Sequence, residues 1–460
     1  MFLGWKETAV RKIMGFVSSI YSGYLVRGIT ALWQMRLLSS LLDHDEKGEE
    51  KVERIKRKYL LRIVKYAREH TAYYRDRIPV DVSWRNVYEV MDKMAVLQRC
   101  DIKDSGEALK SDEFKRLPKI QLSTSGTTGI PLKYFRCGDY EISHQHFLYK
   151  FITGRRGVFY DPRRIVTFGG CYIDDDRREK GIFWEEKMDF VYGSCLFSCF
   201  YLTEENLPFY IAKIEKIKPT FIRSYPSALL LFVELCKRKG VRVRSAIEGI
   251  YVTSENVTQD GMRTISDFFN APVHGQYGHS EACVFGFTEN CGTKYYCSDL
   301  YGYVQVVDEN GRHVKVGEMG RVVATSYLNR AMPFIKYETG DLAVYGGHER
   351  GFTILTQLLG RTQDYVLNED NERIYIIVGQ LSECFLPAIN HVMHWQAIQD
   401  KAGEMVLKIV KKESYSQKDE DEIYRTMKAN KVTTSFEYVE DIPLTKAGKR
   451  KYIIQNIPLA

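Results

Sequence analysis

Apolar and polar positions follow two periodicities, one of strands and one of helices, through the central part of the chain, from about residue 117 to residue 344. Short runs rich in β-branched and aromatic residues predict strands, and longer amphipathic runs between them predict helices. Strands that alternate with helices in this way favour an α/β fold with a mainly parallel sheet. The predicted strands are 164–168, 220–223, 249–253, 273–276 and 303–307, and the predicted helices are 206–217, 227–239 and 258–269.

The pattern changes near Gly360, and beyond it short strands surround a single helix. These elements predict a separate, small α+β unit. We therefore expect two domains: a large one over residues 1–363, which begins with a helical arm (1–70), and a small one over residues 364–460. The predicted strands of the small domain are 373–378, 392–400, 404–410 and 434–439, and its predicted helix is 418–428.

Residues 1–42 contain basic residues with interleaved aromatic side chains, a pattern typical of one or two basic amphipathic helices. Two interpretations stay open: weak contact with a membrane surface or a partner, and a helical arm packed on its own domain, which is the more common case. The charge-dense stretch 43–58 predicts a solvated turn that enters a helix at 59–69. The most apolar N-terminal stretch, 13–26, is shorter than the ~20 residues of a membrane span and lacks a signal-peptide cleavage pattern, so we expect a cytoplasmic protein.

The composition mainly excludes other classes of protein. The 460 residues are 44% hydrophobic and 27% charged, which is ordinary for a globular protein and excludes disorder and a disulfide scaffold. A net charge of +7 on so long a chain does not indicate nucleic acid, although it is compatible with anionic substrates. The ten cysteines include no Cys-x-x-Cys pair, so reduced thiols are expected. Cys283, Cys291 and Cys297 lie near His279 without a standard zinc spacing, and whether they bind a metal stays open.

The densest chemical signal is a run of hydroxyl residues and glycines before Ile130. Glycines let backbone N–H groups approach an anion closely, and hydroxyls add neutral donors, so the run suits a polyphosphate. It lacks the spacing of a P-loop, and a Ser/Thr-rich surface turn would explain such a run when it stands alone. The residues of this run are Ser123, Thr124, Ser125, Gly126, Thr127, Thr128 and Gly129.

Two further motifs follow elements of the predicted sheet. Gln-Tyr-Gly-His-Ser-Glu (276–281) comes directly after a predicted strand, where α/β sheets bind ligands. Glu281 there suits Mg²⁺, which prefers one or two carboxylates together with substrate phosphates. Tyr-Glu-Thr-Gly-Asp (337–341) places Asp341 after a glycine, where its carboxylate suits the two hydroxyls of a ribose. Each motif by itself is also explained by an ordinary helix start or turn.

The last two motifs lie at and beyond the change of pattern. Gly-Arg-Thr-Gln-Asp (360–364) offers Arg361 to ribose or phosphate oxygens, and Asp364 is a candidate hinge. The run 443–451 contains four cations, and Lys449 follows a glycine, from which it suits the charge on a phosphate-linked leaving group. A solvated basic tail is the alternative for this run.

Together, the five motifs in this order resemble the adenylate-forming superfamily of acyl-CoA synthetases, adenylation domains and luciferases, over about residues 120–451. Within it, the chain is most similar to the phenylacetate–CoA ligase and CapK-like capsule-biosynthesis branch. The resemblance implies a large N-terminal domain and a small, mobile C-terminal domain that rotates about Asp364. It also implies adenylation of a small carboxylic acid by ATP, with release of pyrophosphate, followed by acyl transfer.

The resemblance further implies roles for the motif residues of this sequence. The hydroxyl and glycine run would hold the ATP phosphates; Thr128, Glu281 and Lys449 would be catalytic, with Glu281 as the Mg²⁺ ligand. Glu338 stands where relatives carry a basic residue, so its carboxylate would either repel phosphate or point to solvent. The other nucleotide-binding residues would be Ser254, Glu255, Gln276, Tyr277, Gly278, Ser280, Asp341 and Arg361.

Three functions stay open. In the first, ATP, Mg²⁺ and coenzyme A serve an acid–CoA ligase. In the second, the acyl group passes to a carrier or a sugar during surface-polysaccharide assembly, or a group other than a carboxylate is adenylated. In the third, a degenerate ligase fold is a non-catalytic scaffold, which the joint presence of Glu281, Asp341, Arg361 and Lys449 disfavours.

Overall fold

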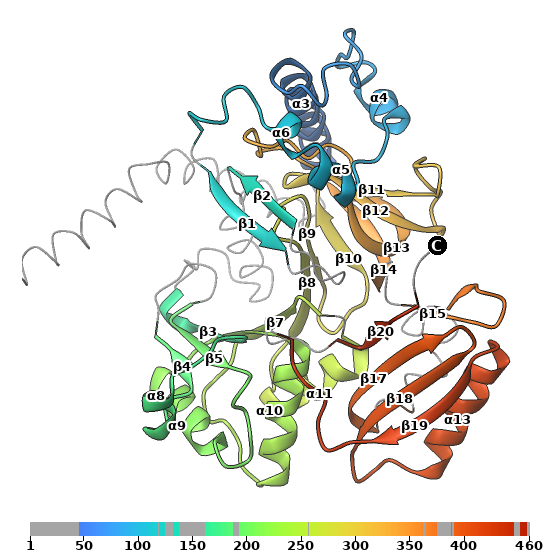
Figure 1. Cartoon of the computed structure of the whole chain (residues 1–460). Helices are drawn as coiled ribbons and strands as arrows, with labels where there is room; N and C mark the ends of the chain where they lie inside the picture. Colours follow the sequence, from blue (N-terminus) through green and yellow to red (C-terminus); the bar gives the residue numbers. More distant parts are fainter. Residues whose placement is uncertain are drawn as a thin grey trace, which may run out of the picture.

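The structure of the chain is a computed structural model (Figure 1). It describes residues 46–117, 119–124, 132–137, 162–186, 193–255, 257–361, 365–374, 388, 391–445 and 451–457. Most of these residues surround one mixed sheet in which twelve strands are described, in the order β11-β12-β13-β14-β10-β9-β8-β7-β6-β3-β5-β4.

The half of this sheet from β8 to β5 is parallel. α9 (Leu207–Ile217) connects β5 to β6, α10 (Pro226–Arg238) connects β6 to β7, and α11 (Gln259–Phe269) connects β7 to β8. Their apolar faces pack on the strands and form one hydrophobic core with them. The strands here are β3 (Ile165–Gly169), β5 (Cys195–Ser198), β6 (Phe221–Ser224), β7 (Gly249–Thr253), β8 (Val273–Gly278) and the antiparallel edge strand β4 (Trp184–Glu185).

The other half of the sheet is antiparallel, beginning with the pair β8 and β9. A second core cluster fills the space between this half and the helices of the N-terminal region. Its strands are β9 (Phe285–Thr288), β10 (Tyr295–Ser298), β11 (Gly302–Val307), β12 (Met319–Ser326), β13 (Tyr337–Glu349) and β14 (Phe352–Arg361).

The periodicity of the sequence predicted these elements closely. The predicted strand 249–253 coincides with β7, and the predicted helix 258–269 differs from α11 only by Thr258. Thr258 is the N-cap of α11, and its hydroxyl oxygen accepts the backbone N–H of Gly261 at 3.0 Å. The α/β fold class is confirmed, with the sheet parallel in one half and antiparallel in the other.

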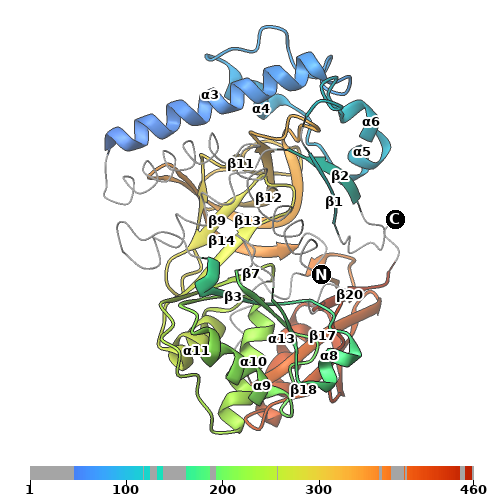
Figure 2. The same ribbon diagram turned by 90° about the vertical axis from the view of Figure 1, so that its left-hand side faces the viewer.

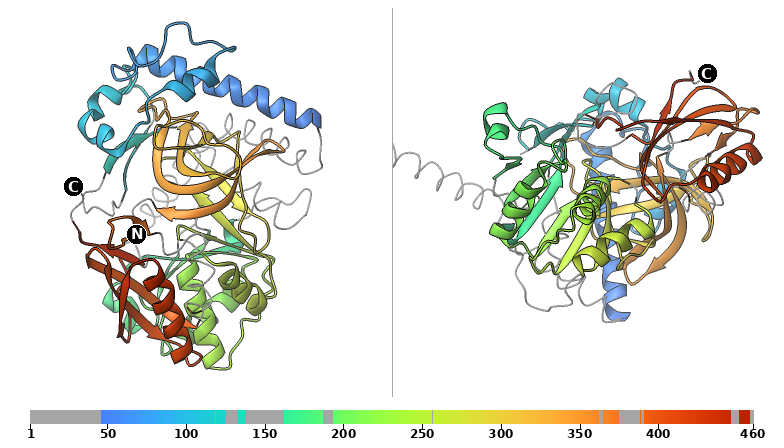
Figure 3. Two further views of the ribbon diagram at one scale, coloured as in Figure 1. Left: turned by 90° about the vertical axis from the view of Figure 1, so that its right-hand side faces the viewer. Right: turned by 90° about the horizontal axis from the view of Figure 1, so that it is seen from below.

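The small domain is a four-stranded sheet in the order β19-β18-β17-β20, with α13 (Gln417–Ala429) packed on it. Figure 3 shows this domain beside the half of the large domain that contains α9 to α11. Leu444 packs against the core of that half. The exact domain boundary at residues 363 and 364 stays a prediction. The strands are β17 (Val392–Lys401), β18 (Glu404–Lys411), β19 (Thr433–Tyr438) and β20 (Ile453–Gln455).

Shorter elements complete the described chain. The hairpin of β1 (Ile120–Thr124) and β2 (Leu132–Arg136) forms a separate two-stranded sheet. The short elements are α4 (Val87–Lys93), α5 (Arg99–Asp104), α6 (Gly106–Leu109), α8 (Asp175–Glu179), the 3₁₀ turn Pro162–Arg164, β15 (Val366–Leu367) and β16 (Arg373–Ile374).

One prediction, for the charge-dense stretch 43–58, is wrong. This stretch was expected to be a solvated turn before a helix, but α3 (Glu46–His70) already begins at Glu46 and runs along the outside of the large domain (Figure 2). The stretch is helical because Val52, Ile55 and Leu60 recur at helical spacing and are buried against the domain.

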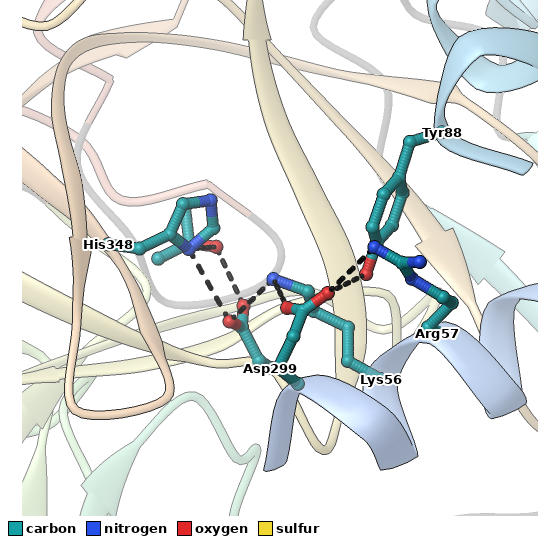
Figure 4. A network of polar contacts seen from close by, with 7 residues as sticks. Lys56, Arg57, Tyr88, Asp299 and His348 are labelled. Carbon is teal, nitrogen blue, oxygen red and sulfur yellow. Dashed lines mark hydrogen bonds and ion pairs between the residues drawn. The ribbon is translucent and has the colours of Figure 1, made fainter. Parts of the chain in front are cut away.

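One charged residue of this stretch is also buried. The ammonium group of Lys56 lies 3.1 Å from Oδ2 of Asp299 and 2.9 Å from Glu53, and Lys56 is only 5% exposed (Figure 4). Burial alone would lower the pKa of Lys56, but the carboxylates of Asp299 and Glu53 outweigh it and raise the pKa above its usual value. The contact joins α3 to the residue that follows β10, so it fixes the helix to the sheet.

Candidate active site

The candidate site lies where β7 and β8 end. These two strands are parallel neighbours, so their carboxyl ends meet at one edge of the sheet, where open α/β sheets bind ligands. Ser254 and Glu255 follow β7, and Ser280 and Glu281 follow β8. Ser254 has a φ of +71°, a left-handed conformation that turns the chain sharply out of the strand.

Tyr277 and Asp341, predicted from separate motifs, are in direct contact. The hydroxyl of Tyr277 donates to Oδ2 of Asp341 at 2.8 Å, and both residues are buried. The backbone N–H of Asp341 donates to the hydroxyl of Thr339 at 3.2 Å, and Gly340 between them has a φ of +81°, which favours glycine. Burial, and then the negative charge of Asp341, raise the pKa of Tyr277, so its hydroxyl remains a neutral donor.

Glu281 is held in a second contact of the same kind. Its Oε1 accepts the hydroxyl of Tyr337 at 2.9 Å, and its Oε2 lies 3.4 Å from the hydroxyl of Ser280. Burial, followed by the charge of Glu281, raises the pKa of Tyr337 well above its usual value, so this tyrosine also stays neutral and donates.

The surroundings of Glu281 fit a metal cation. Glu281 is 5% exposed, and within the described ranges it makes no ion pair. A buried carboxylate is costly without a positive partner, and Mg²⁺ binds carboxylate oxygens readily. The residues present are therefore suited to Mg²⁺ together with an anionic substrate.

The hydroxyl and glycine run is tied to Glu281 through its own hairpin. Ser123 and Thr124 lie in β1, and Thr124 pairs with Leu132 in β2. From the end of β2, Arg136 donates through Nη1 to the backbone oxygen of Ser280 at 2.7 Å. This contact ties the hairpin to the Glu281 segment at the end where Arg136 pairs with Ile120, although Arg136 and Ser280 are 144 residues apart in sequence.

Other predicted residues make contacts that sequence reasoning did not foresee. Glu255 accepts the backbone N–H of Ser227 at 3.1 Å, so it stabilises the beginning of α10. Glu338 was expected either to repel phosphate or to point to solvent. Instead, its carboxylate forms an ion pair with Arg321 at 3.0 Å, and this arginine neutralises its charge.

Gln276 and Gly278 lie in β8 itself. The side-chain oxygen of Gln276 is buried and accepts no hydrogen bond from the described residues. A buried carbonyl oxygen without a donor is unfavourable by about 1–3 kcal/mol. This atom therefore fits a ligand or a water molecule that donates to it.

Several predicted residues lie outside what the structure describes, and their roles stay predictions. They are Ser125, Gly126, Thr127, Thr128, Gly129, Asp364 and Lys449, together with the side chains of Ser123, Thr124 and Arg361 and the arm at residues 1–42. The backbone of Arg361 is described at the end of β14, where it pairs with Asp341. The zinc question has a partial answer: within the described ranges, no three His, Cys, Asp or Glu side chains are grouped to hold a metal ion.

Sequence reasoning assigned no role to two residues that support this site. Tyr337 belongs to a motif that was recognised, but only the fold brings its hydroxyl to Glu281. Arg136 gave no signal at all, because an arginine at the end of a hairpin strand is common and its contact is long-range.

A buried histidine of β8 gives the site region a pH-dependent stability. Nδ1 of His274 lies 2.7 Å from the backbone oxygen of Thr288, and burial lowers the pKa of His274 below 6.5. The unfolded chain then binds the proton more readily. The contribution of His274 to the free energy of unfolding is therefore fully present above pH 6.5 and is lost as the pH falls below it.

We expect the thermal midpoint of the parent protein to be lower at about pH 5.5 than at pH 7.5. The decrease should be smaller in His274→Asn, which keeps a donor to Thr288. Equal losses in the two proteins, measured by circular dichroism, would contradict this expectation.

Comparisons with known proteins concern the fold and the small domain. Residues 369–456 match the CapK C-terminal domain. Protein CapK of Staphylococcus aureus is 21% identical over 379 residues, which cover 80% of each chain. Phenylacetate-coenzyme A ligase of Thermus thermophilus is 24% identical over 201 residues, 42% of this chain and 44% of that protein. A crystal structure of 2-hydroxyisobutyryl-CoA ligase in the postadenylation state with 2-HIB-AMP aligns with a TM-score of 0.65 at 16% identity, covering 89% of this chain and 90% of that one.

The fold is therefore that of the adenylate-forming ligases. Within that class, the matches to the CapK C-terminal domain and to protein CapK support a CapK-like protein. This confirms the resemblance indicated by the five motifs. In the described part of the chain, no helix is both long enough and apolar enough to cross a membrane.

Proposed function

We infer that this protein adenylates a small carboxylic acid with ATP and releases pyrophosphate. The observation that carries this proposal is the buried carboxylate of Glu281, which lacks a cationic partner among the described residues and lies beside the hairpin of the hydroxyl and glycine run. A metal site beside the hairpin that carries the predicted phosphate loop suits nucleoside triphosphate chemistry. The ligase fold and the phenylacetate-coenzyme A ligase relative support the same reaction.

The described residues suggest how ATP would be bound. Asp341, oriented by Tyr277, would accept the ribose hydroxyls, and the unpartnered oxygen of Gln276 would accept a hydrogen bond from the base or a bound water. Glu281, oriented by Tyr337, would hold Mg²⁺. When bound, Mg²⁺ would neutralise negative charge on the phosphate oxygens.

In the reaction, a carboxylate oxygen of the acid attacks the α-phosphorus of ATP. The bond from this phosphorus to the bridging oxygen breaks, and pyrophosphate leaves with its electron pair. Donors of the loop 123–129 and the ammonium group of Lys449 would stabilise the negative charge that develops. A second nucleophile then attacks the acyl carbon, and AMP leaves.

The test is ATP–pyrophosphate exchange with the purified protein, Mg²⁺ and a panel of aliphatic, hydroxy and aromatic carboxylic acids. We expect exchange with at least one class of acid, because formation of the acyl-adenylate is reversible. Exchange with no acid in the panel would contradict the proposal and would favour a non-carboxylate substrate or a non-catalytic scaffold.

The variant Lys449→Ala tests whether the measured exchange is catalysed by this protein and not by a contaminant. The variant should fold normally and lose roughly 100- to 1,000-fold of the exchange rate, because the lysine would act on developing charge and not on packing. A conservative Lys449→Arg variant keeps the charge and should lose less.

For the acceptor, we favour coenzyme A, and the phenylacetate-coenzyme A ligase relative supports this choice. Both ATP and coenzyme A would be drawn from the cytoplasm, where we place the reaction. The second candidate acceptor is a carrier or a sugar of a surface polysaccharide. The relative that covers most of this chain, protein CapK, and the CapK C-terminal domain favour it. Thioester formation on addition of coenzyme A to the exchange reaction distinguishes the two.

A further inference from the structure

The outer face of α3 carries a row of cations that the candidate active site does not use. Five basic residues between positions 51 and 65 are exposed, and the one acid between them, Glu53, is half-buried; the exposed acids Glu49 and Glu50 lie before this row on the same helix. At 1.5 Å per residue, the row extends over about 21 Å. We call it the basic ridge; its members are Lys51, Arg54, Lys58, Arg62 and Lys65.

The inner face of α3 holds this ridge in a fixed position. Lys56 is paired with Asp299, and Glu53 accepts the hydroxyl of Tyr88 in α4 at 2.7 Å (Figure 4). Apolar residues of the same face are buried in the core of the large domain. Because the single acid of this stretch, Glu53, is engaged in these contacts, it does not neutralise the ridge.

Apolar side chains lie beside the ridge. Nε of Arg68 donates to the backbone oxygen of Ile78 at 3.2 Å, and the guanidinium of Arg57 lies 5.4 Å from the ring centroid of Trp84. The segment from Ile78 to Trp84 therefore runs along α3 in the opposite direction. Within it, Val80 is 79% exposed and Trp84 is 42% exposed.

We propose that the basic ridge and the adjoining Val80 and Trp84 dock this protein on an anionic phospholipid surface. A row of cations attracts the negative headgroups, while an exposed tryptophan and an aliphatic side chain suit the boundary between headgroups and acyl chains. Nucleic acid would complement the cations but not the exposed aliphatic side chain. The inference is independent of the proposed reaction.

Two further observations favour a phospholipid surface. In the sequence before α3, residues 1–42 contain five basic residues, one acidic residue and several aromatic ones, and Asp43 and Asp45 separate them from the helix. Figures 1 and 2 show α3 at the end of the molecule opposite the small domain, so docking through α3 leaves that domain accessible.

The experiment is sedimentation of the full chain with vesicles of phosphatidylcholine alone or with 30% phosphatidylglycerol. We expect binding to the anionic vesicles, little binding to the neutral ones, and loss of binding in high salt. The triple variant Arg54→Gln, Lys58→Gln, Arg62→Gln should bind roughly 100-fold more weakly, since each basic residue near the surface contributes about a fivefold factor.

The matched control removes three exposed cations from another helix. Lys418→Gln, Arg425→Gln and Lys428→Gln in α13 change the net charge equally and should leave vesicle binding unchanged. All residues changed are exposed, so thermal midpoints should stay near that of the parent. Three results would overturn the proposal: no binding of the parent to anionic vesicles, equal weakening by both triple variants, or tighter binding to a short DNA duplex than to the vesicles at the same salt.

Discussion

Replacing Glu281 with glutamine is expected to slow ATP–pyrophosphate exchange by roughly 100- to 1,000-fold, because a metal ion bound at a reacting phosphate supplies several kcal/mol of charge stabilisation. Glutamine keeps the size of the side chain and can still accept the hydroxyl of Tyr337, so the fold should be retained. Without the negative charge, the protein should need a higher Mg²⁺ concentration for half-maximal exchange.

The matched variant for this prediction is Tyr337→Phe. It leaves the Glu281 carboxylate in place and removes only the donor that orients it, so the expected loss is about 10-fold, as for other groups that orient metal ligands. Thermal midpoints measured alongside separate a loss of chemistry from a loss of folding. If Glu281→Gln showed the parent rate and the parent Mg²⁺ dependence, Glu281 would not be the metal ligand.

The largest effect on stability is expected from Lys56→Met. This change leaves the carboxylate of Asp299, which is 2% exposed, buried without its charged partner. Breaking a buried ion pair from one side lowers the free energy of unfolding by about 3–5 kcal/mol. Urea titration followed by tryptophan fluorescence would measure the change.

Two controls test whether the lost pair is the cause. Lys58→Met removes an exposed lysine from the same helix and should change the free energy of unfolding by no more than about 0.5 kcal/mol. Lys56→Met combined with Asp299→Leu removes both charges and should cost less than the sum of the two single changes. Additive costs would show that the two residues do not interact.

The fold was predictable because its elements are short and strongly patterned. β7 and α11 follow from local periodicity and, for α11, from a capping threonine that forms a local contact. The pattern was misleading in 43–58, where charge density suggested solvent. There the sparse apolar residues decide the structure, and Lys56 is buried because Asp299, 243 residues away, supplies its partner.

The candidate site was predictable in part, for a related reason. Tyr277 and Asp341 could be named from motifs, although both lie within strands, Tyr277 in β8 and Asp341 in β13. Their contact with each other joins two strands that are not neighbours in the sheet, so it depends on how the sheet curves. The pairing of Glu338 with Arg321 depends on the register of the neighbouring strands β12 and β13.

By itself, the sequence therefore determined the elements, the fold class and the residues that carry the candidate chemistry, because periodicity, caps and turn residues act within a few positions along the chain. How these residues meet depends on the three-dimensional arrangement of the strands and helices. Tyr337 reaches Glu281, Arg136 reaches Ser280, and Lys56 reaches Asp299. Such contacts join residues from 56 to 243 positions apart, and they arise from strand order, register and burial, which no local pattern encodes.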